Sequence, residues 1–149
     1  MVLEQCLVRA ISYSLSKVLL NLDLVNILLV EPDQILGGAV QSALLTADYG
    51  VVWKRTAQTA LDALDEGIPD LIILELQLGL HNGIEFLYEI ASYPEWQHIP
   101  VIVHTINAKA QDDIFGESFY QLKVKAVLYK PKTSTLQLVQ AVKHLTIMA

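Results

Sequence analysis

From Val25 onward, short apolar runs alternate with longer stretches in which apolar residues recur at helical spacing. Three of the five runs are nearly continuous hydrophobic blocks, which is typical of strands buried on both faces of a parallel sheet. The pattern therefore predicts five strands within one domain. The predicted strands are Val25–Val30, Gly50–Lys54, Leu71–Leu74, Val101–Thr105 and Ala126–Tyr129.

The stretches between the strands carry the start and stop signals of helices. Helices are predicted over Gln34–Ala47, from Ala57 to a stop at Gly67, before Pro94, and after the Ser and Thr residues at positions 133–135. Five strands that alternate with helices imply right-handed crossovers and an open, doubly wound α/β sheet. In such sheets the functional site lies at the carboxyl ends of the strands.

The first 24 residues form a separate segment with helical periodicity of its own. Glu4, Arg9 and Lys17 interrupt it, so that no run reaches the roughly 18 apolar residues of a membrane span, and no signal-peptide pattern is present. We expect an amphipathic helix over residues 1–24 in front of a domain over residues 25–149. The helix would bury its stripe against that domain, a partner chain or a membrane surface, or it has no role. The stripe consists of Leu3, Leu7, Ile11, Leu15, Val18 and Leu22.

Composition narrows the class of protein. With 149 residues and 53% hydrophobic content, the chain can form an ample core, which excludes an intrinsically disordered protein. Its net charge of -6 argues against nucleic-acid binding, because that function needs clustered positive charge. The single cysteine, Cys6, cannot form an internal disulfide, and we therefore expect a cytoplasmic protein.

The residues at the carboxyl ends of the predicted strands are the candidates for the site. They are Glu31, Pro32 and Asp33 after the first strand, Glu75 and Gln77 after the third, Thr105 at the end of the fourth, and Lys130 and Pro131 after the fifth.

Four segments that contain these residues resemble the receiver domain of bacterial two-component response regulators. The segments are ILLVEPD (27–33), DLIILELQLGLHNGIEFL (70–87), PVIVHT (100–105) and YKPK (129–132), and they follow one another with intact spacing. The resemblance implies a flavodoxin-like sheet with strand order 2-1-3-4-5, here with the extra N-terminal helix. It also implies phosphoryl transfer from a histidine kinase to an aspartate at the end of the third strand, next to Mg²⁺ held by acids after the first.

Some family positions are kept. Carried over residue by residue, Thr105 matches the hydroxyl residue and Lys130 the lysine that contact the phosphoryl oxygens, and Pro131 matches the cis-proline that follows. The aromatic residue that reports phosphorylation in the family would fall at Val127 and is absent, and Tyr129 lies two residues further on.

Other positions depart from the family pattern. Glu75 stands in place of the acceptor aspartate, and its extra methylene displaces the carboxylate by about 1.5 Å, enough to slow phosphoryl transfer by orders of magnitude. Pro32 replaces the second acid of the metal site, Asp33 comes one place late, and Gln77 could offer only its backbone carbonyl. Glu31 and Glu75 would hold Mg²⁺ weakly or not at all, so we expect no cofactor.

These departures predict a receiver-like module that is not an enzyme, is not phosphorylated, and acts through protein–protein interaction. Glu75 could imitate a phosphorylated aspartate by pairing with Lys130. A plainer interpretation is that Glu75 and Lys130 form a buried ion pair with no signalling role. His104 is expected to be a packing histidine with satisfied hydrogen bonds, on the strand face opposite Thr105.

Two alternative functions remain open at this stage. One is conventional phosphorelay with weak or unusual phosphoacceptance, and the other is a flavodoxin-like flavin protein. The acidic, proline-containing loop after the first strand argues against flavin phosphate binding.

The expected partners are proteins: a histidine kinase, another regulator, or a second copy of the chain in a homodimer. An aromatic patch of Phe115, Phe119, Tyr120 and Tyr129 is predicted to bind a partner or the N-terminal stripe. The interface residues singled out are Leu7, Ile11, Val18, Phe119 and Tyr129.

Overall fold

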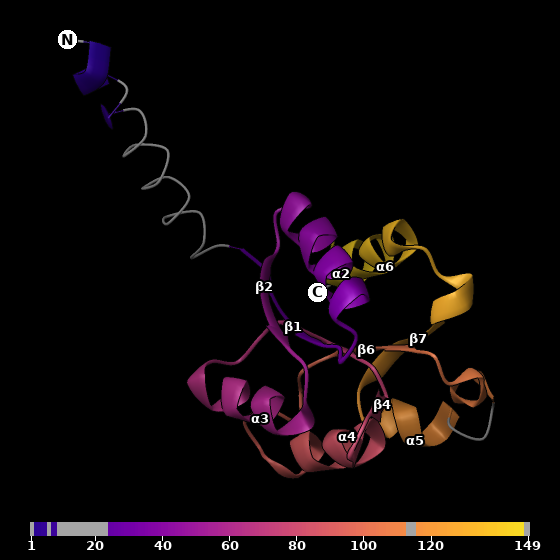
Figure 1. Ribbon diagram of the computed structural model, residues 1–149. Helices are drawn as coiled ribbons and strands as arrows, with labels where there is room; N and C mark the ends of the chain where they lie inside the picture. Colours follow the sequence, from indigo (N-terminus) through magenta and orange to yellow (C-terminus); the bar gives the residue numbers. More distant parts are fainter. Residues whose placement is uncertain (1, 6, 9–23, 113–115, 148–149) are drawn as a thin grey trace.

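A computed structural model of the chain describes residues 2–5, 7–8, 24–112 and 116–147. Five parallel strands form one sheet in the order β2-β1-β3-β6-β7, which confirms the predicted 2-1-3-4-5 topology (Figure 1). The strands are β1 (Asn26–Val30), β2 (Gly50–Lys54), β3 (Leu71–Leu74), β6 (Val101–Thr105) and β7 (Val124–Tyr129).

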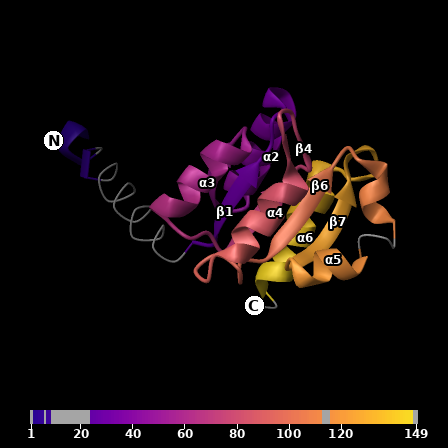
Figure 2. The same ribbon diagram turned by 90° about the horizontal axis from the view of Figure 1, so that it is seen from below.

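Helices cover both faces of the sheet, so that the protein has three layers (Figures 1 and 2). On one face lie α2 (Gln34–Thr46) and α6 (Thr135–Ile147), and on the other α3 (Ala57–Glu66), α4 (Gly83–Ser92) and α5 (Gly116–Gln121). The connections also contain the short strands β4 (Gln77–Leu78) and β5 (His81–Asn82) and the 3₁₀ turns η1 (Ala108–Gln111) and η3 (Lys130–Lys132).

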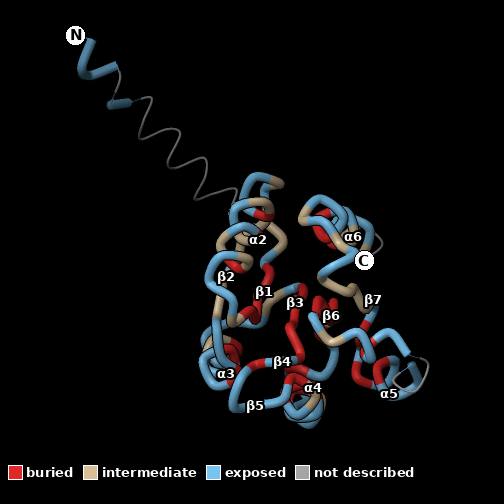
Figure 3. The backbone as a smooth tube through the Cα atoms, turned by 45° about the vertical axis from the view of Figure 1, so that its right-hand side comes forward, coloured by how far each residue is buried: buried red, intermediate tan, exposed pale blue. Residues whose placement is uncertain are grey.

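The central strands are buried on both faces, as their unbroken hydrophobic sequences predict. All residues of β3 and β6 are buried, and only the first residue of β1 is exposed (Figure 3). Alternate residues point into two separate cores. Leu28 and Val30 pack toward α3 and α4, while Ile27 and Leu29 pack toward α2 and α6. This double burial fixes the strands and therefore the positions of the residues at their carboxyl ends.

The last strand begins two residues earlier than the predicted Ala126. Val124 is buried and pairs with Val101, but the exposed Lys123 and Lys125 on either side of it hide the strand pattern in the sequence. Lys123 has a positive φ of 63° and turns the chain into the strand.

Residues 2–5 and 7–8 of the N-terminal segment are helical. The side chains of Leu3 and Leu7 are 80% and 58% exposed. Ile11, Val18 and the rest of the predicted stripe lie outside the described residues. In the part of the chain that the structure describes, no helix is long and apolar enough to cross a membrane.

Candidate functional site

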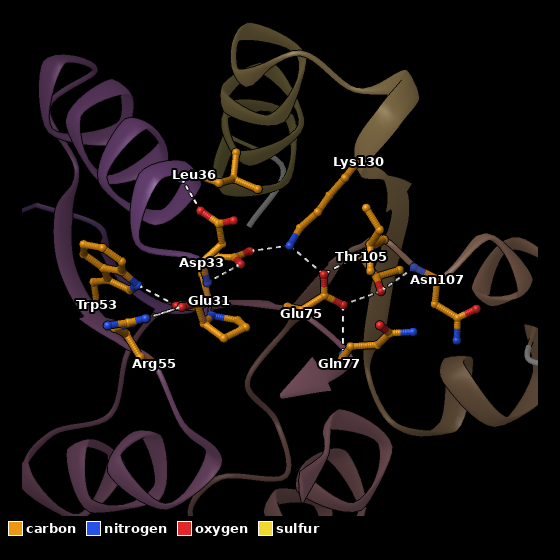
Figure 4. A network of polar contacts seen from close by, with 12 residues as sticks. Glu31, Asp33, Leu36, Trp53, Arg55, Glu75, Gln77, Thr105, Asn107 and Lys130 are labelled. Carbon is orange, nitrogen blue, oxygen red and sulfur yellow. Dashed lines mark hydrogen bonds and ion pairs between the residues drawn. The ribbon is translucent and has the colours of Figure 1, made fainter. Parts of the chain in front are cut away.

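Four side chains meet at the carboxyl edge of the sheet (Figure 4). Glu31 follows β1, Glu75 follows β3, Thr105 ends β6, and Lys130 follows β7. Because β1, β3, β6 and β7 are neighbours in the sheet, their carboxyl ends bring these residues together. Both glutamates are 2% exposed and Thr105 is completely buried. The structure therefore brings together the four central residues of the predicted pocket.

The ammonium group of Lys130 lies between the two carboxylates. Its Nζ is 2.7 Å from Oε2 of Glu31 and 2.6 Å from Oε2 of Glu75. The Lys130 side chain is 12% exposed, so the pair is shielded from most of the solvent. The structure thus contains the predicted Glu75–Lys130 ion pair, with Glu31 as a second partner for the same cation.

Glu75 accepts three further hydrogen bonds. The hydroxyl of Thr105 and the backbone N–H of Gln77, at 2.9 Å, donate to Oε1. The backbone N–H of Ile106 donates to Oε2 at 3.0 Å. Thr105 is therefore turned toward Glu75, whereas the side chain of Gln77 is exposed.

Asp33 turns away from the pocket, as its late position predicts. Its carboxylate accepts from the N–H of Leu36 at 2.8 Å and caps the first turn of α2. The backbone N–H of Asp33 donates to Oε1 of Glu31 at 3.0 Å. Asp33 thus contributes its backbone to the pocket and its side chain to the helix.

Two residues of the edge strand region, Trp53 and Arg55, hold the loop after β1 and were missed by the sequence analysis. The indole N–H of Trp53 donates to the Glu31 carbonyl at 2.9 Å. The guanidinium of Arg55 donates twice to the Pro32 carbonyl, at 3.0 and 2.8 Å. The predicted strand order could have indicated this role, because it places the second strand beside the first. In that pairing Trp53 lies next to Leu29, close to the loop after β1.

The expected cis peptide at Pro131 is wrong. Every peptide bond that the structure describes is trans, including the bond between Lys130 and Pro131. Here Pro131 lies in the turn η3, at a position near the turn's start where its missing N–H removes no hydrogen bond. The trans form is also the intrinsically preferred one, by about 0.5–1 kcal/mol.

The two glutamates differ in acidity. Burial raises the pKa of Glu31, and the hydrogen bonds from Lys130 and from the N–H of Asp33 offset only part of that effect. Burial acts in the same direction on Glu75, but hydrogen bonds from Lys130, Thr105 and the N–H of Gln77 together hold the pKa of Glu75 below its ordinary value. The pocket therefore favours the ionised form of Glu75 more strongly than that of Glu31.

His104 is buried and belongs to the face opposite Thr105, as predicted. Ile102, two residues earlier on the same face of β6, packs in the core under α2 and α6. The expectation of satisfied hydrogen bonds is wrong at Nδ1, which has no partner among the described residues. Burial, followed by the nearby charge of Lys130, lowers the pKa of His104 to about 4, so the ring is neutral at pH 7.

The predicted aromatic patch is only partly exposed. Phe119 is 4% exposed and packs in the core under α5, so it is not an interface residue. In the short helix α5, Phe119 is the residue that is buried against that core. Tyr120 is 77% exposed, Tyr129 is half-buried, and Phe115 lies outside the described residues.

The pocket does not match a Mg²⁺ site. It offers two carboxylates, and Pro32 has no side-chain oxygen. Within residues 2–5, 7–8, 24–112 and 116–147, no three His, Cys, Asp or Glu side chains group together as metal ligands. Mg²⁺ demands near-octahedral coordination by oxygen atoms, which this set supplies poorly.

Comparisons with known proteins agree with the fold. The response regulator receiver domain family matches residues 27–143. The swarming motility regulation protein RssB of Serratia marcescens is 40% identical over 80 residues, which is 54% of this chain and 36% of that protein. The chain thus spans little more than a third of the length of that relative.

Two solved structures illustrate the likeness in fold. The phosphorylated cyanobacterial phytochrome response regulator RcpA is 34% identical, with a TM-score of 0.66 over 82% of this chain and 91% of that chain. The chemotaxis response regulator CheY4 of Vibrio cholerae is 18% identical, with a TM-score of 0.71 over 81% of this chain and 98% of that chain. The family match favours the receiver interpretation over the flavin-binding alternative.

Proposed function

The chain belongs to the response regulator receiver domain family of two-component signalling, and we propose that it signals by binding a protein partner without being phosphorylated. In this proposal Glu75 takes the place of a phosphorylated aspartate. The partner is a histidine kinase or another regulator, recognised through the surface around the pocket.

The donor set around Glu75 carries the proposal. The resemblance to receiver domains assigns the Thr105 hydroxyl and the Lys130 ammonium to the phosphoryl oxygens. Here both groups are bonded to Glu75 itself, and the Ile106 N–H joins them at 3.0 Å. A carboxylate extended by one methylene, about 1.5 Å, reaches toward donors that would otherwise contact a phosphoryl group.

The same contacts oppose phosphorylation of Glu75. To attack phosphorus, a carboxylate oxygen must be free and aligned with the donor. Both oxygens of Glu75 already accept two hydrogen bonds or ion-pair contacts each. An attack would have to break at least part of this buried network.

The first prediction is that the wild-type protein forms no phosphoryl adduct with acetyl phosphate and Mg²⁺, as measured by intact mass. The matched variant Pro32→Asp with Glu75→Asp restores the family's residues and is expected to form the adduct. A wild-type adduct that disappears in Glu75→Gln would instead support conventional phosphorelay.

The role of Glu75 as a mimic has a separate readout. Amide NMR spectra of the restored variant are expected to move toward the wild-type spectrum when that variant is phosphorylated, at Thr105, Ile106 and the residues around them. Movement away from the wild-type spectrum would contradict the mimic and leave Glu75–Lys130 as a structural ion pair.

A further inference from the structure

We propose that Lys130 is the resident cation of the pocket, that its ammonium occupies the place of a divalent metal between Glu31 and Glu75, and that it closes the site to metals. Receiver domains are expected to bind Mg²⁺ at this edge of the sheet with the same lysine present. Here Pro32 removes one acid of the metal site, and Lys130 contacts both carboxylates that remain. The proposal concerns the cation alone and stands whether or not a partner recognises Glu75.

The first observation is the bridging geometry. One Nζ lies 2.7 Å from Glu31 and 2.6 Å from Glu75, and both carboxylates are 2% exposed. Two carboxylates at this burial need a nearby positive charge, because an unpaired buried charge is very costly. Lys130 supplies that charge to both (Figure 4).

The second observation is that all four carboxylate oxygens already have donors. For Glu31, Oε1 accepts from the N–H of Asp33 and Oε2 contacts Lys130. For Glu75, Oε1 accepts from the Thr105 hydroxyl and the Gln77 N–H, and Oε2 contacts Lys130 and the Ile106 N–H. A metal would have to displace donors from these oxygens before it could bind.

The third observation concerns the neighbouring ligand positions. The Pro32 carbonyl accepts both hydrogen bonds from Arg55, whose guanidinium brings a second positive charge to this edge. The carboxylate of Asp33 is engaged in capping α2. Neither neighbour is therefore free to complete a coordination shell, and Arg55 adds to the repulsion of an arriving cation.

Removal of the ammonium should reverse this situation. Lys130→Met keeps an unbranched side chain of similar length but leaves two buried carboxylates that face each other without a cation. Such a pair can be neutralised by a divalent ion, which prefers carboxylate oxygens. The variant should therefore gain the metal site that the wild-type protein lacks.

The test compares Mn²⁺ binding by wild-type protein, Lys130→Met and Lys130→Met with Glu31→Gln, measured by EPR of free Mn²⁺ and by the melting temperature. We expect at least a tenfold tighter Mn²⁺ affinity in Lys130→Met than in the wild type. Mn²⁺ should raise the melting temperature of that variant only, and the added Glu31→Gln change should remove the gain.

Two outcomes would overturn the proposal: wild-type affinity for Mn²⁺ equal to that of Lys130→Met, or a gain that survives Glu31→Gln. If Lys130→Met does not fold alone, recovery of its circular dichroism on refolding with Mn²⁺ supports the proposal, and failure to recover contradicts it. Phosphorylation of the wild-type protein would contradict the proposed function but would leave these Mn²⁺ results unaffected.

Discussion

His104 makes the stability of the protein sensitive to acid. Its pKa is lowered to about 4 by burial and by the charge of Lys130, whereas the unfolded chain takes up the proton near the ordinary value of 6.5. Between these two values the unfolded state binds more protons than the folded state, so the free energy of unfolding falls as the pH drops through this window.

His104→Leu is therefore expected to reduce the loss of stability between pH 6.5 and pH 4, by at most about 3 kcal/mol. Urea unfolding at several pH values measures the difference. Equal profiles for His104→Leu and the wild type would contradict the prediction.

At the level of single residues, the sequence predicts which residues form the pocket better than it predicts which of their side chains are in contact. Glu31, Glu75, Thr105 and Lys130 could be assigned to one pocket because each directly ends or follows a buried parallel strand. The bridging position of Lys130 could not be predicted, since it depends on side-chain reach across four neighbouring strands.

At the level of elements, α2 contains two adjacent glycines with different surroundings. A Cβ atom on Gly37 would lie 2.1 Å from Cζ2 of Trp53, whereas a Cβ on Gly38 would meet nothing within 4 Å. Gly37 thus allows the indole of Trp53 to lie against the helix while its N–H reaches Glu31. Glycine has a lower helix propensity than alanine, but at this position the absence of a Cβ atom leaves the space that Trp53 occupies.

Gly37→Ala is expected to destabilise the protein by about 1–3 kcal/mol, because Trp53 must move despite the gain in helix propensity. Gly38→Ala is the matched control and should stabilise it by roughly 0.5–1 kcal/mol. Thermal or urea unfolding measures both variants. The prediction fails if the two alanines change the free energy of unfolding in the same direction.

The predicted bounds of β2, β3 and β6 are confirmed, whereas β1 begins one residue later and β7 two residues earlier than predicted. The unbroken hydrophobic run of β3 gave both ends of that strand correctly. The start of β7 was missed, because Val124 is buried between two exposed lysines. The two-residue strands β4 and β5 are too short to leave a periodic signal.

At the level of the whole molecule, hydrogen bonds between described residues hold the amino end of the sheet together. The N–H of Asn26 donates to the Asp70 carboxylate at 2.8 Å, and the N–H of Asp70 donates to the Asn26 carbonyl at 2.8 Å. The first strand is thereby tied to the start of the third by groups within the domain itself.

Deletion of residues 1–24 is therefore expected to leave the circular dichroism spectrum of the receiver fold intact. It should also convert a dimer into a monomer in light scattering, because the exposed Leu3 and Leu7 need an apolar partner. Leu7→Glu in the full chain tests the same contact without a deletion. A monomeric full-length protein would refute dimerisation, and loss of the fold would make the segment part of the core.

The bond from Trp53 to the Glu31 carbonyl gives the protein an intrinsic optical probe. Trp53 is half-buried, and its indole nitrogen lies 2.9 Å from the carbonyl oxygen of Glu31, a pocket residue. Trp96 is buried, and the centroid of its ring lies 4.6 Å from that of Tyr93. Tryptophan fluorescence depends on the hydrogen bonding and polarity around the indole. A movement of the loop after β1 should therefore change the emission of Trp53 and leave that of Trp96 constant, so that events in the pocket can be followed in solution without a label.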